Sequence, residues 1–377
     1  MCELIYSQTS FYTQNYKHTT NNLEFFPAEH SDYEHFLSEF VDHKLESILE
    51  CYNLICYKKD LELLLNHALN HNLILNFYCD AKIVLRHLSE NKTQEQLLIT
   101  FRAILLDLNQ QSTIAKNFHL DRDSNFVIEI MRFIEEFVEK KMYGNSELEY
   151  CKDNQFLIFS PQAAAYFVHE IFGHMLEYDY VKSQNSIYSE KQVGTKLFHD
   201  DITVIDDPHQ GFRIGLYFGE YQHNGKKLVP QMLIKDGVLL DFVKASRVDK
   251  IQNAPSNRMH ILYLDKNHSG KNLNTLIQET KEGYVITTID NAFIHPTTGA
   301  FHLQCRNCYK IHNGKKTGII PAIVLQGHSG DILSNTLHVG SDLEFFASQC
   351  GKNGQILSVG TGAPSLLLNS SLFSISI

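Results

Sequence analysis

Proline and glycine are scarce in this chain, at 8 and 20 of 377 residues, and only 20% of the residues are charged. Hydrophobic residues make up 43%, so intrinsic disorder and fibrous repeats are excluded as the main state. No window contains the roughly 18 apolar residues that a membrane-spanning helix requires. We therefore expect a globular protein that does not cross a membrane.

An excess of positive charge is also missing. The formal net charge is -10 at pH 7, which disfavours nucleic acid or an anionic membrane as the main partner. The first twenty residues have no basic start followed by an apolar core, so we expect no secretory signal and a cytoplasmic location. In a reducing cytosol the 8 cysteines would be free thiols or metal ligands rather than disulfides.

A chain of 377 residues suits two domains of ordinary size. Apolar residues recur at helical spacing in the first part, whereas short β-like runs alternate with turn signals after about residue 150. We therefore predict an α+β protein with a helix-rich domain over residues 1–150 and a β-rich domain over 151–377. The predicted helices cover about 36–52, 61–69, 93–108, 124–141 and 161–178, with a strand at 72–79 and a frayed end or one or two strands within 1–32. The predicted strands of the second domain lie within 212–221, 228–243, 284–294, 300–311 and 321–327.

Residues 169–174 read HEIFGH, which places two histidines and a glutamate on a predicted helix. Neutral imidazoles bind Zn²⁺, and an adjacent carboxylate can take a proton from water. The histidines are five residues apart instead of the usual four, which on a straight α-helix separates them by about 140° around the axis. A π-type turn would reduce this angle to about 50°, and Gly173 has the backbone freedom for it. We therefore expect a kinked HExxxH helix, the alternative being two polar residues on a half-exposed helix face.

A second segment lies near the other end of the chain, where residues 350–355 read CGKNGQ and residues 358–366 read SVGTGAPSL. Together with HEIFGHMLEYD at 169–179, this segment resembles the two signatures of the TldD/PmbA metallopeptidase family. The resemblance covers about residues 155–366. Further stretches follow in the family's order: VIDDP (204–208), LIKDGVLLDFV (233–243), Arg258-Met259, TTGAF (297–301), YKIHNGK (309–315) and VGSDLEF (339–345).

The resemblance implies a role for each matched residue. His169, His174 and Cys350 would bind one Zn²⁺ per chain, and Glu170 would be the general base. It also implies a peptidase that acts on unfolded peptides or small proteins and forms a homodimer or a heterodimer with a second family subunit. The first 140 or so residues have no recognisable counterpart in the family, and we expect them to cover the zinc cleft as a lid or dimerisation arm.

Two other functions stay open. One branch of the family lacks the zinc motif and supplies a non-catalytic partner subunit, but here the motif is intact. A purely structural zinc site is the other, although such a site does not need Glu170 and usually has four protein ligands.

Weaker signals occur at other positions. Glu177 and Asp179 could accept a hydrogen bond from a ligand imidazole, the alternative being a solvated helix end. Cys305 and Cys308 form a CxxC motif, but residues three apart on a strand point to opposite faces, which disfavours joint metal binding. The pair Asp206-Asp207 is typical of a β-turn rather than of a metal site.

Overall fold

The computed structural model describes residues 2–12, 17–26, 58–89, 92–107, 113–120, 130–135, 137–138 and 155–376, except 215, 217, 219–225, 249–254, 268–269 and 353. The chain divides into two compact units, Met1–Lys141 and Met142–Ile377. Within the described part of the chain, every helix is too short or too polar to cross a membrane.

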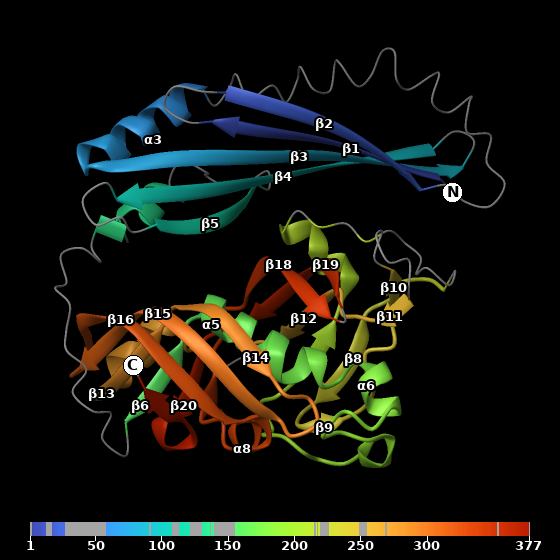
Figure 1. The fold of residues 1–377 in the computed structure, drawn as a ribbon, viewed down its shortest axis with the longest axis vertical. Helices are drawn as coiled ribbons and strands as arrows, with labels where there is room; N and C mark the ends of the chain where they lie inside the picture. The colour runs from blue at the N-terminus through green and yellow to red at the C-terminus, as the bar shows by residue number, and fades with distance from the viewer. Residues whose placement is uncertain are drawn as a thin grey trace. The chain divides into compact units, whose positions relative to one another are not determined.

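The N-terminal unit is built on a five-stranded antiparallel sheet (Figure 1). Helix α3 (Lys58–Asn70) precedes the third strand, and residues 130–135 are also helical. Side chains of both helical segments share one buried cluster with strand residues such as Leu75 and Leu105. In sheet order the strands are β2 (Lys17–Phe26), β1 (Cys2–Tyr12), β3 (Leu73–Ser89), β4 (Lys92–Asp107) and β5 (Thr113–Leu120).

The prediction of a helix-rich N-terminal domain is wrong for the described residues, because a sheet is the main element. The clearest error is the helix predicted at 93–108, which is strand β4. Ala103 and Leu105 are fully buried and alternate with half-buried residues, which is the period of a strand with one covered face. Since β4 pairs with β3 on one side and β5 on the other, the ladder hydrogen bonds override the helix propensity of its Gln and Glu residues.

The other N-terminal predictions have mixed outcomes. Helix α3 contains the helix predicted at 61–69, and β3 contains nearly all of the strand predicted at 72–79. Of the helix predicted at 124–141, residues 130–135 and 137–138 are helical. Strands β1 and β2 agree with one of the two alternatives for residues 1–32, and the helix predicted at 36–52 lies outside the described residues.

The C-terminal unit is rich in sheet, as the sequence predicts, and its described strands form two larger sheets and the short pair β10 (Ser246–Val248) and β11 (Pro255–Asn257). The eight-stranded sheet runs β17 (His338–Val339), β20 (Leu366–Asn369), β6 (Phe156–Phe159), β13 (Glu282–Ile286), β15 (Ala300–His312), β16 (Lys315–His328), β21 (Ser374–Ser376), with β14 (Thr288–Ile294) paired to β15. The six-stranded sheet runs β18 (Glu344–Lys352), β19 (Gln355–Ala363), β12 (Ile261–Leu264), β7 (Val204–Asp206), β8 (Gln231–Lys235), β9 (Val238–Leu239).

One helix joins the two sheets. It consists of α5 (Pro161–Val168) followed without a break by the π-helix η2 (His169–His174). It packs against β18, β19 and β12 of the smaller sheet and against β6 and β14 of the larger one (Figure 1). The remaining helices are α6 (Tyr178–Lys182), η3 (Glu190–Gln192), η4 (Pro208–Ile214), α7 (Leu273–Glu279), α8 (Ser329–Ser334) and η5 (Ser370–Leu372).

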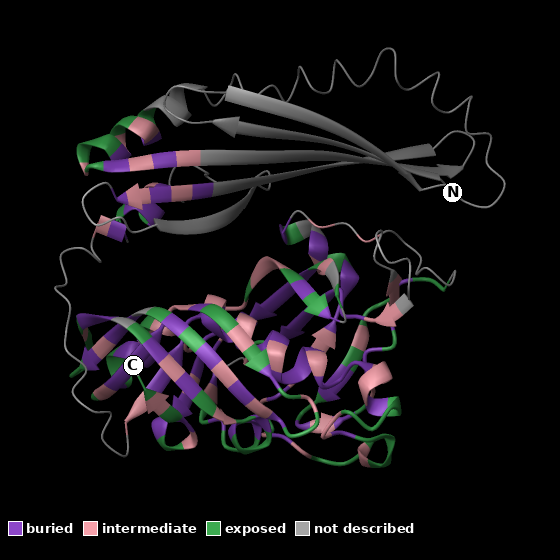
Figure 2. Cartoon of the chain, in the orientation of Figure 1, coloured by how far each residue is buried: buried purple, intermediate pink, exposed green. Residues whose placement is uncertain are grey.

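The core of this unit lies between the sheets and around the α5–η2 helix, where buried positions concentrate in Figure 2. Burial of one Phe such as Phe167 contributes about 1.5–3 kcal/mol, so this helix is firmly held. The strands predicted at 228–243, 284–294, 300–311 and 321–327 correspond to β8–β9, β13–β14, β15 and β16. Of the strand predicted at 212–221, residues 212–214 belong instead to η4.

Candidate metal centre

The sequence before the histidines fixes the start of the helix. Ser160 is the N-cap and its Oγ accepts a hydrogen bond from the backbone N of Ala163 at 3.4 Å, while Pro161 occupies the first turn, where its missing N–H costs nothing. Ala163, Ala164 and Ala165 are fully buried, so their small side chains let neighbouring strands approach closely. Thr361 of β19 donates from Oγ1 to the carbonyl oxygen of Ala165 at 2.6 Å. The helix is thereby tied to the β18–β19 hairpin.

The five-residue spacing of the histidines coincides with the π-helical turn η2. Its wider turn brings residues i and i+5 onto one face. The ring centroids of His169 and His174 are 5.2 Å apart, with perpendicular ring planes. Gly173 does not adopt a positive φ, so the reason for a glycine here is space: a Cβ would lie 2.6 Å from Cε of Met259.

Cys350 on β18 completes a cluster of three donors. Its Sγ is 3.4 Å from Nε2 of His174, and one donor atom from each of the three side chains lies within 4.8 Å of the others. Among the residues that the structure describes, this is the one such group of three or more His, Cys, Asp or Glu donors. Residues 181 positions apart in the sequence thus meet because α5 packs on the hairpin that carries Cys350.

The chemistry of the cluster fits a zinc ion. Two imidazoles and one thiolate are typical zinc ligands and leave a fourth tetrahedral position free. The Nδ1 atom of His169 is buried and has no hydrogen-bond partner among the described residues, which is costly for a polar atom unless something binds it. Metal coordination by His169 would account for this atom.

Glu177 connects the cluster to a set of buried charges. It is fully buried, and its Oε2 lies 3.4 Å from Nδ1 of His174 and 2.8 Å from Nζ of Lys352. Its Oε1 is 4.0 Å from Nη1 of Arg258, which is also fully buried. Lys352 in turn contacts Asp179, with Nζ 2.6 Å and 2.7 Å from the two carboxylate oxygens. A buried carboxylate on the second nitrogen of His174 would fix the orientation of that ring.

The surroundings shift the pKa of the candidate residues in different directions. Burial first, then the nearby charges of His174 and Arg258, hold the pKa of His169 well below its usual value. Burial also opposes charge on His174, but hydrogen bonds to Cys350 and Glu177 outweigh it and raise the pKa of His174 well above its usual value. Burial raises the pKa of Glu170, which lies between the histidines on η2. In the metal-free chain His169 is therefore neutral, whereas a metal must displace a proton from His174.

Of the two acceptors that the sequence offers for a ligand imidazole, Glu177 lies against His174 and Asp179 contacts Lys352 instead. The solvated-helix-end interpretation is wrong for Glu177, which is fully buried. Arg258 and Lys352 were part of the family resemblance but had no assigned role, and no spacing in the sequence indicates that two distant cations meet the same carboxylate. Asp206 has a structural role outside the donor cluster: its Oδ1 accepts hydrogen bonds from the backbone N atoms of His260 and Ile261, both at 2.9 Å.

Two further cysteines that the structure describes, Cys305 and Cys308, lie outside the cluster. Both are buried in β15 and belong to the hydrophobic core. Burial, and to a lesser degree the charge of Asp290, raises the pKa of the Cys305 thiol to about 12, which disfavours a thiolate.

The fold and this donor set lie within the C-terminal unit, and the same residues match a known protein family. Residues 154–374, more than half of the chain, match the family model described as the PmbA/TldA metallopeptidase C-terminal domain. The chain belongs to the TldD/PmbA family.

Individual relatives agree with this assignment. A protein of Archaeoglobus fulgidus named metalloprotease is 28% identical over 223 residues, which are 56% of this chain and 51% of the relative. A protein of Saccharolobus solfataricus named zinc metalloprotease TldD homolog is 23% identical over 225 residues, 55% of this chain and 48% of the relative. The chain spans about half the length of the curated relatives it matches.

A solved structure supports the fold over nearly the whole chain. TldE from Thermococcus kodakarensis superposes with a TM-score of 0.65 at 14% identity, covering 98% of this chain and 95% of that chain. At this identity the likeness bears on the fold alone.

Proposed function

We propose that the chain is a zinc-dependent peptidase of the TldD type, which hydrolyses peptide bonds in unfolded peptides or small proteins. The observation that carries the proposal is the convergence of His169, His174 and Cys350, whose donor atoms lie within 4.8 Å of one another. The name of the Saccharolobus solfataricus relative supports zinc as the metal. A structural zinc would require a fourth protein ligand, and among the described residues the donor group has three members.

The residues of the chain would divide the work as follows. Zinc, when bound, would act as a Lewis acid toward the scissile carbonyl and lower the pKa of a water molecule. Glu170 would accept a proton from that water and pass it to the leaving amine, and its raised pKa brings it closer to the range in which a general base works at neutral pH. Glu177 would hold the His174 ring in place through Nδ1.

The strands next to the helix would receive the substrate backbone. Strand β18, which carries Cys350, is an edge strand of the six-stranded sheet, and β14 has one described pairing partner, β15. Both strands pack against α5. An extended peptide added to such an edge is held by main-chain hydrogen bonds, which suits substrates of varied sequence. We further propose that residues 1–150 act as a lid or dimerisation arm over residues 151–377, in a homodimer or a heterodimer with a second family subunit.

The alternative function is that of a non-catalytic partner subunit, and the fold likeness to TldE is compatible with it. The intact and converging donor set favours the catalytic function, since a subunit without turnover has no need of Glu170 beside two metal ligands.

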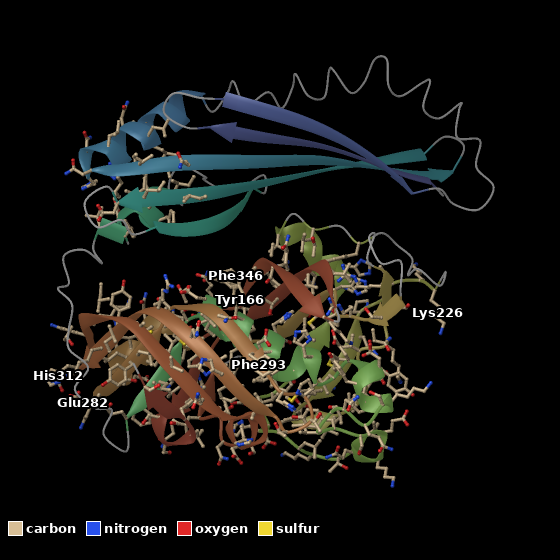
Figure 3. All side chains as sticks on the ribbon, viewed as in Figure 1. Tyr166, Lys226, Glu282, Phe293, His312 and Phe346 are labelled. Carbon is tan, nitrogen blue, oxygen red and sulfur yellow. The ribbon has the colours of Figure 1, made fainter. Side chains whose placement is uncertain are left out.

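The test is degradation of an unfolded peptide by the zinc-loaded chain, alone and with any family partner, as the wild type and as Glu170→Gln. Loss of a general base should lower turnover by about 10²-fold or more while zinc content and fold are kept. The matched control is Glu282→Gln: Figure 3 shows Glu282 beside His312, with which it pairs, and away from Tyr166 on α5. Activity of Glu170→Gln within a few-fold of the control would refute the general-base role, and absence of activity in the wild type under all these conditions would favour the partner-subunit function.

A further inference from the structure

A guanidinium group lies directly against the sulfur of the candidate metal ligand. Arg258 donates from Nη1 to Sγ of Cys350 at 3.4 Å and from Nη2 to the carbonyl oxygen of Cys350 at 2.8 Å. Its side chain is fully buried, so both contacts are shielded from water. One residue therefore contacts both the side chain and the backbone of Cys350.

The position of Arg258 is built into the fold. The residue follows β11 and precedes β12, and its backbone N donates to the carbonyl oxygen of Ala245 at 3.0 Å. The next residue, Met259, occupies the space left by the missing side chain of Gly173 on η2. The Arg258-Met259 segment is thus fitted to the same helical turn that carries the histidines.

A buried arginine is costly unless its charge is compensated. Glu177 supplies one negative group at 4.0 Å, but Lys352 also draws on that carboxylate at 2.8 Å. Cys350 as a thiolate would supply the second negative group. Asp179 compensates part of the Lys352 charge, and the thiolate of Cys350, when it binds a metal, would be a negative group in direct contact with Arg258.

A hydrogen bond from a cation to a coordinating thiolate withdraws electron density from the sulfur. A thiolate donates more charge to a metal than an imidazole does, and so weakens the metal as a Lewis acid. Groups that hydrogen-bond to metal ligands tune the metal in this way, and their replacement typically costs 10–100-fold in affinity or activity.

We propose that Arg258 is a positioning and tuning residue of the metal centre: it orients Cys350 and limits the charge that the thiolate gives to the metal. This inference rests on the proposed zinc site. Lys352 has a different task, since it reaches His174 through Glu177 and makes no described contact with the sulfur.

The experiment uses the full chain loaded with Co²⁺, whose thiolate-to-cobalt charge-transfer band reports on the sulfur and whose d–d bands report on geometry. Arg258→Met should keep tetrahedral d–d bands and shift the charge-transfer band to lower energy, because the sulfur becomes more electron-rich. The zinc-loaded variant should retain its metal and lose turnover by about 10–100-fold. Arg247→Met is the matched control for loss of a nearby charge: Arg247 donates to the carbonyl oxygens of Met259 at 2.6 Å and Ser358 at 2.7 Å rather than to the sulfur. Its charge acts on Cys350 only through space, so the band of this variant should shift by clearly less than that of Arg258→Met.

Should Arg258→Met fail to fold, Arg258→Lys serves instead, because a single ammonium cannot contact both atoms of Cys350 as the guanidinium does. Its band should shift in the same direction by less. A band at the wild-type position in every folded Arg258 variant would overturn the inference while leaving the zinc proposal intact. A wild-type chain without any charge-transfer band, like Cys350→Ser, would instead overturn the metal site itself.

Discussion

Replacing Glu177 by Gln keeps the size of the side chain but removes the carboxylate that joins His174 to two buried cations. In the structure this carboxylate lies 2.8 Å from Lys352 Nζ, 3.4 Å from His174 Nδ1 and 4.0 Å from Arg258 Nη1, and its side chain is fully buried. Breaking a buried ion pair by removing one partner costs about 3–5 kcal/mol, because the other charge stays buried. Asp179 still compensates Lys352, so we expect a loss near the lower end, about 3 kcal/mol.

The change should also weaken metal binding. At Nδ1 of His174 the charged acceptor is replaced by a neutral amide, which is a weaker acceptor, and loss of such a carboxylate partner typically costs about 10–100-fold in metal affinity. The two effects are separable: urea unfolding of the metal-free chain gives the stability, and competition with a zinc chelator gives the affinity. Lys352→Met removes the cation instead, and the double variant Glu177→Gln/Lys352→Met completes a double-mutant cycle.

We expect the double variant to be more stable than the sum of the single changes predicts, by about 1–3 kcal/mol, because it also removes the lysine that Glu177→Gln leaves with Asp179 as its remaining carboxylate partner. If Glu177→Gln instead unfolds within about 0.5 kcal/mol of the wild type, as a surface substitution would, and binds zinc equally well, the assignment of Glu177 as the support of His174 is refuted.

Further predictions concern the metal, the helix and the N-terminal unit. Elemental analysis should find about one zinc per chain in the wild type. His174→Ala and Cys350→Ala should lose the zinc, whereas the control Cys305→Ala, which removes a buried thiol of β15, should keep it. Equal zinc content in all three variants would reject the site. The pKa of His174 in the metal-free chain is raised, so zinc must displace a proton from this ring. The zinc affinity measured by competition should therefore increase with pH above 6.5 until His174 has lost its proton. A zinc affinity that does not change between about pH 6 and 8 would contradict this. Ala164→Leu should overpack the contact of α5 with the neighbouring strands and lower the free energy of unfolding by about 1–3 kcal/mol. Thermal unfolding measures this loss, with Tyr166→Phe on the same helix as the control. Removal of residues 1–141 should leave a soluble chain that begins to cut folded proteins, whereas unchanged selectivity would reject the lid role.

The sequence predicts the geometry of the two histidines better than it predicts the N-terminal fold, for a physical reason. The donors occur in two short segments. Two histidines five residues apart lie on one face of a helix if the helix makes a π-helical turn there, and the structure contains this turn. Cys350 could be paired with them only through the family resemblance, because nothing local in the sequence links residues 181 positions apart.

Strand β4 shows why the N-terminal prediction fails. Leu97, Leu98 and Ile99 are consecutive apolar residues, which suit both a helix and a strand, and the polar residues before them favour a helix start. The choice is made by pairing with β3, which ends at Ser89 just before β4 begins at Lys92, and with β5, which begins at Thr113 after β4. The pattern within β4 does not show that both neighbours are strands. Arg258 and Lys352 escape prediction because each is an ordinary charged residue until the fold buries it beside Glu177. Glu177 itself is expected from the sequence as one possible acceptor for a ligand imidazole, and it lies 3.4 Å from Nδ1 of His174.

X-ray absorption at the zinc edge of the purified chain tests the central claim most directly, since it reports the atoms around the metal without requiring a substrate. The account predicts one sulfur at about 2.3 Å and two or more nitrogen or oxygen atoms at about 2.0–2.1 Å. The sulfur shell should disappear in Cys350→Ser and stay unchanged in Glu170→Gln, because Glu170 is assigned to the base and not to the metal. A chain that holds no zinc, or a zinc shell without sulfur in the wild type, would contradict the account.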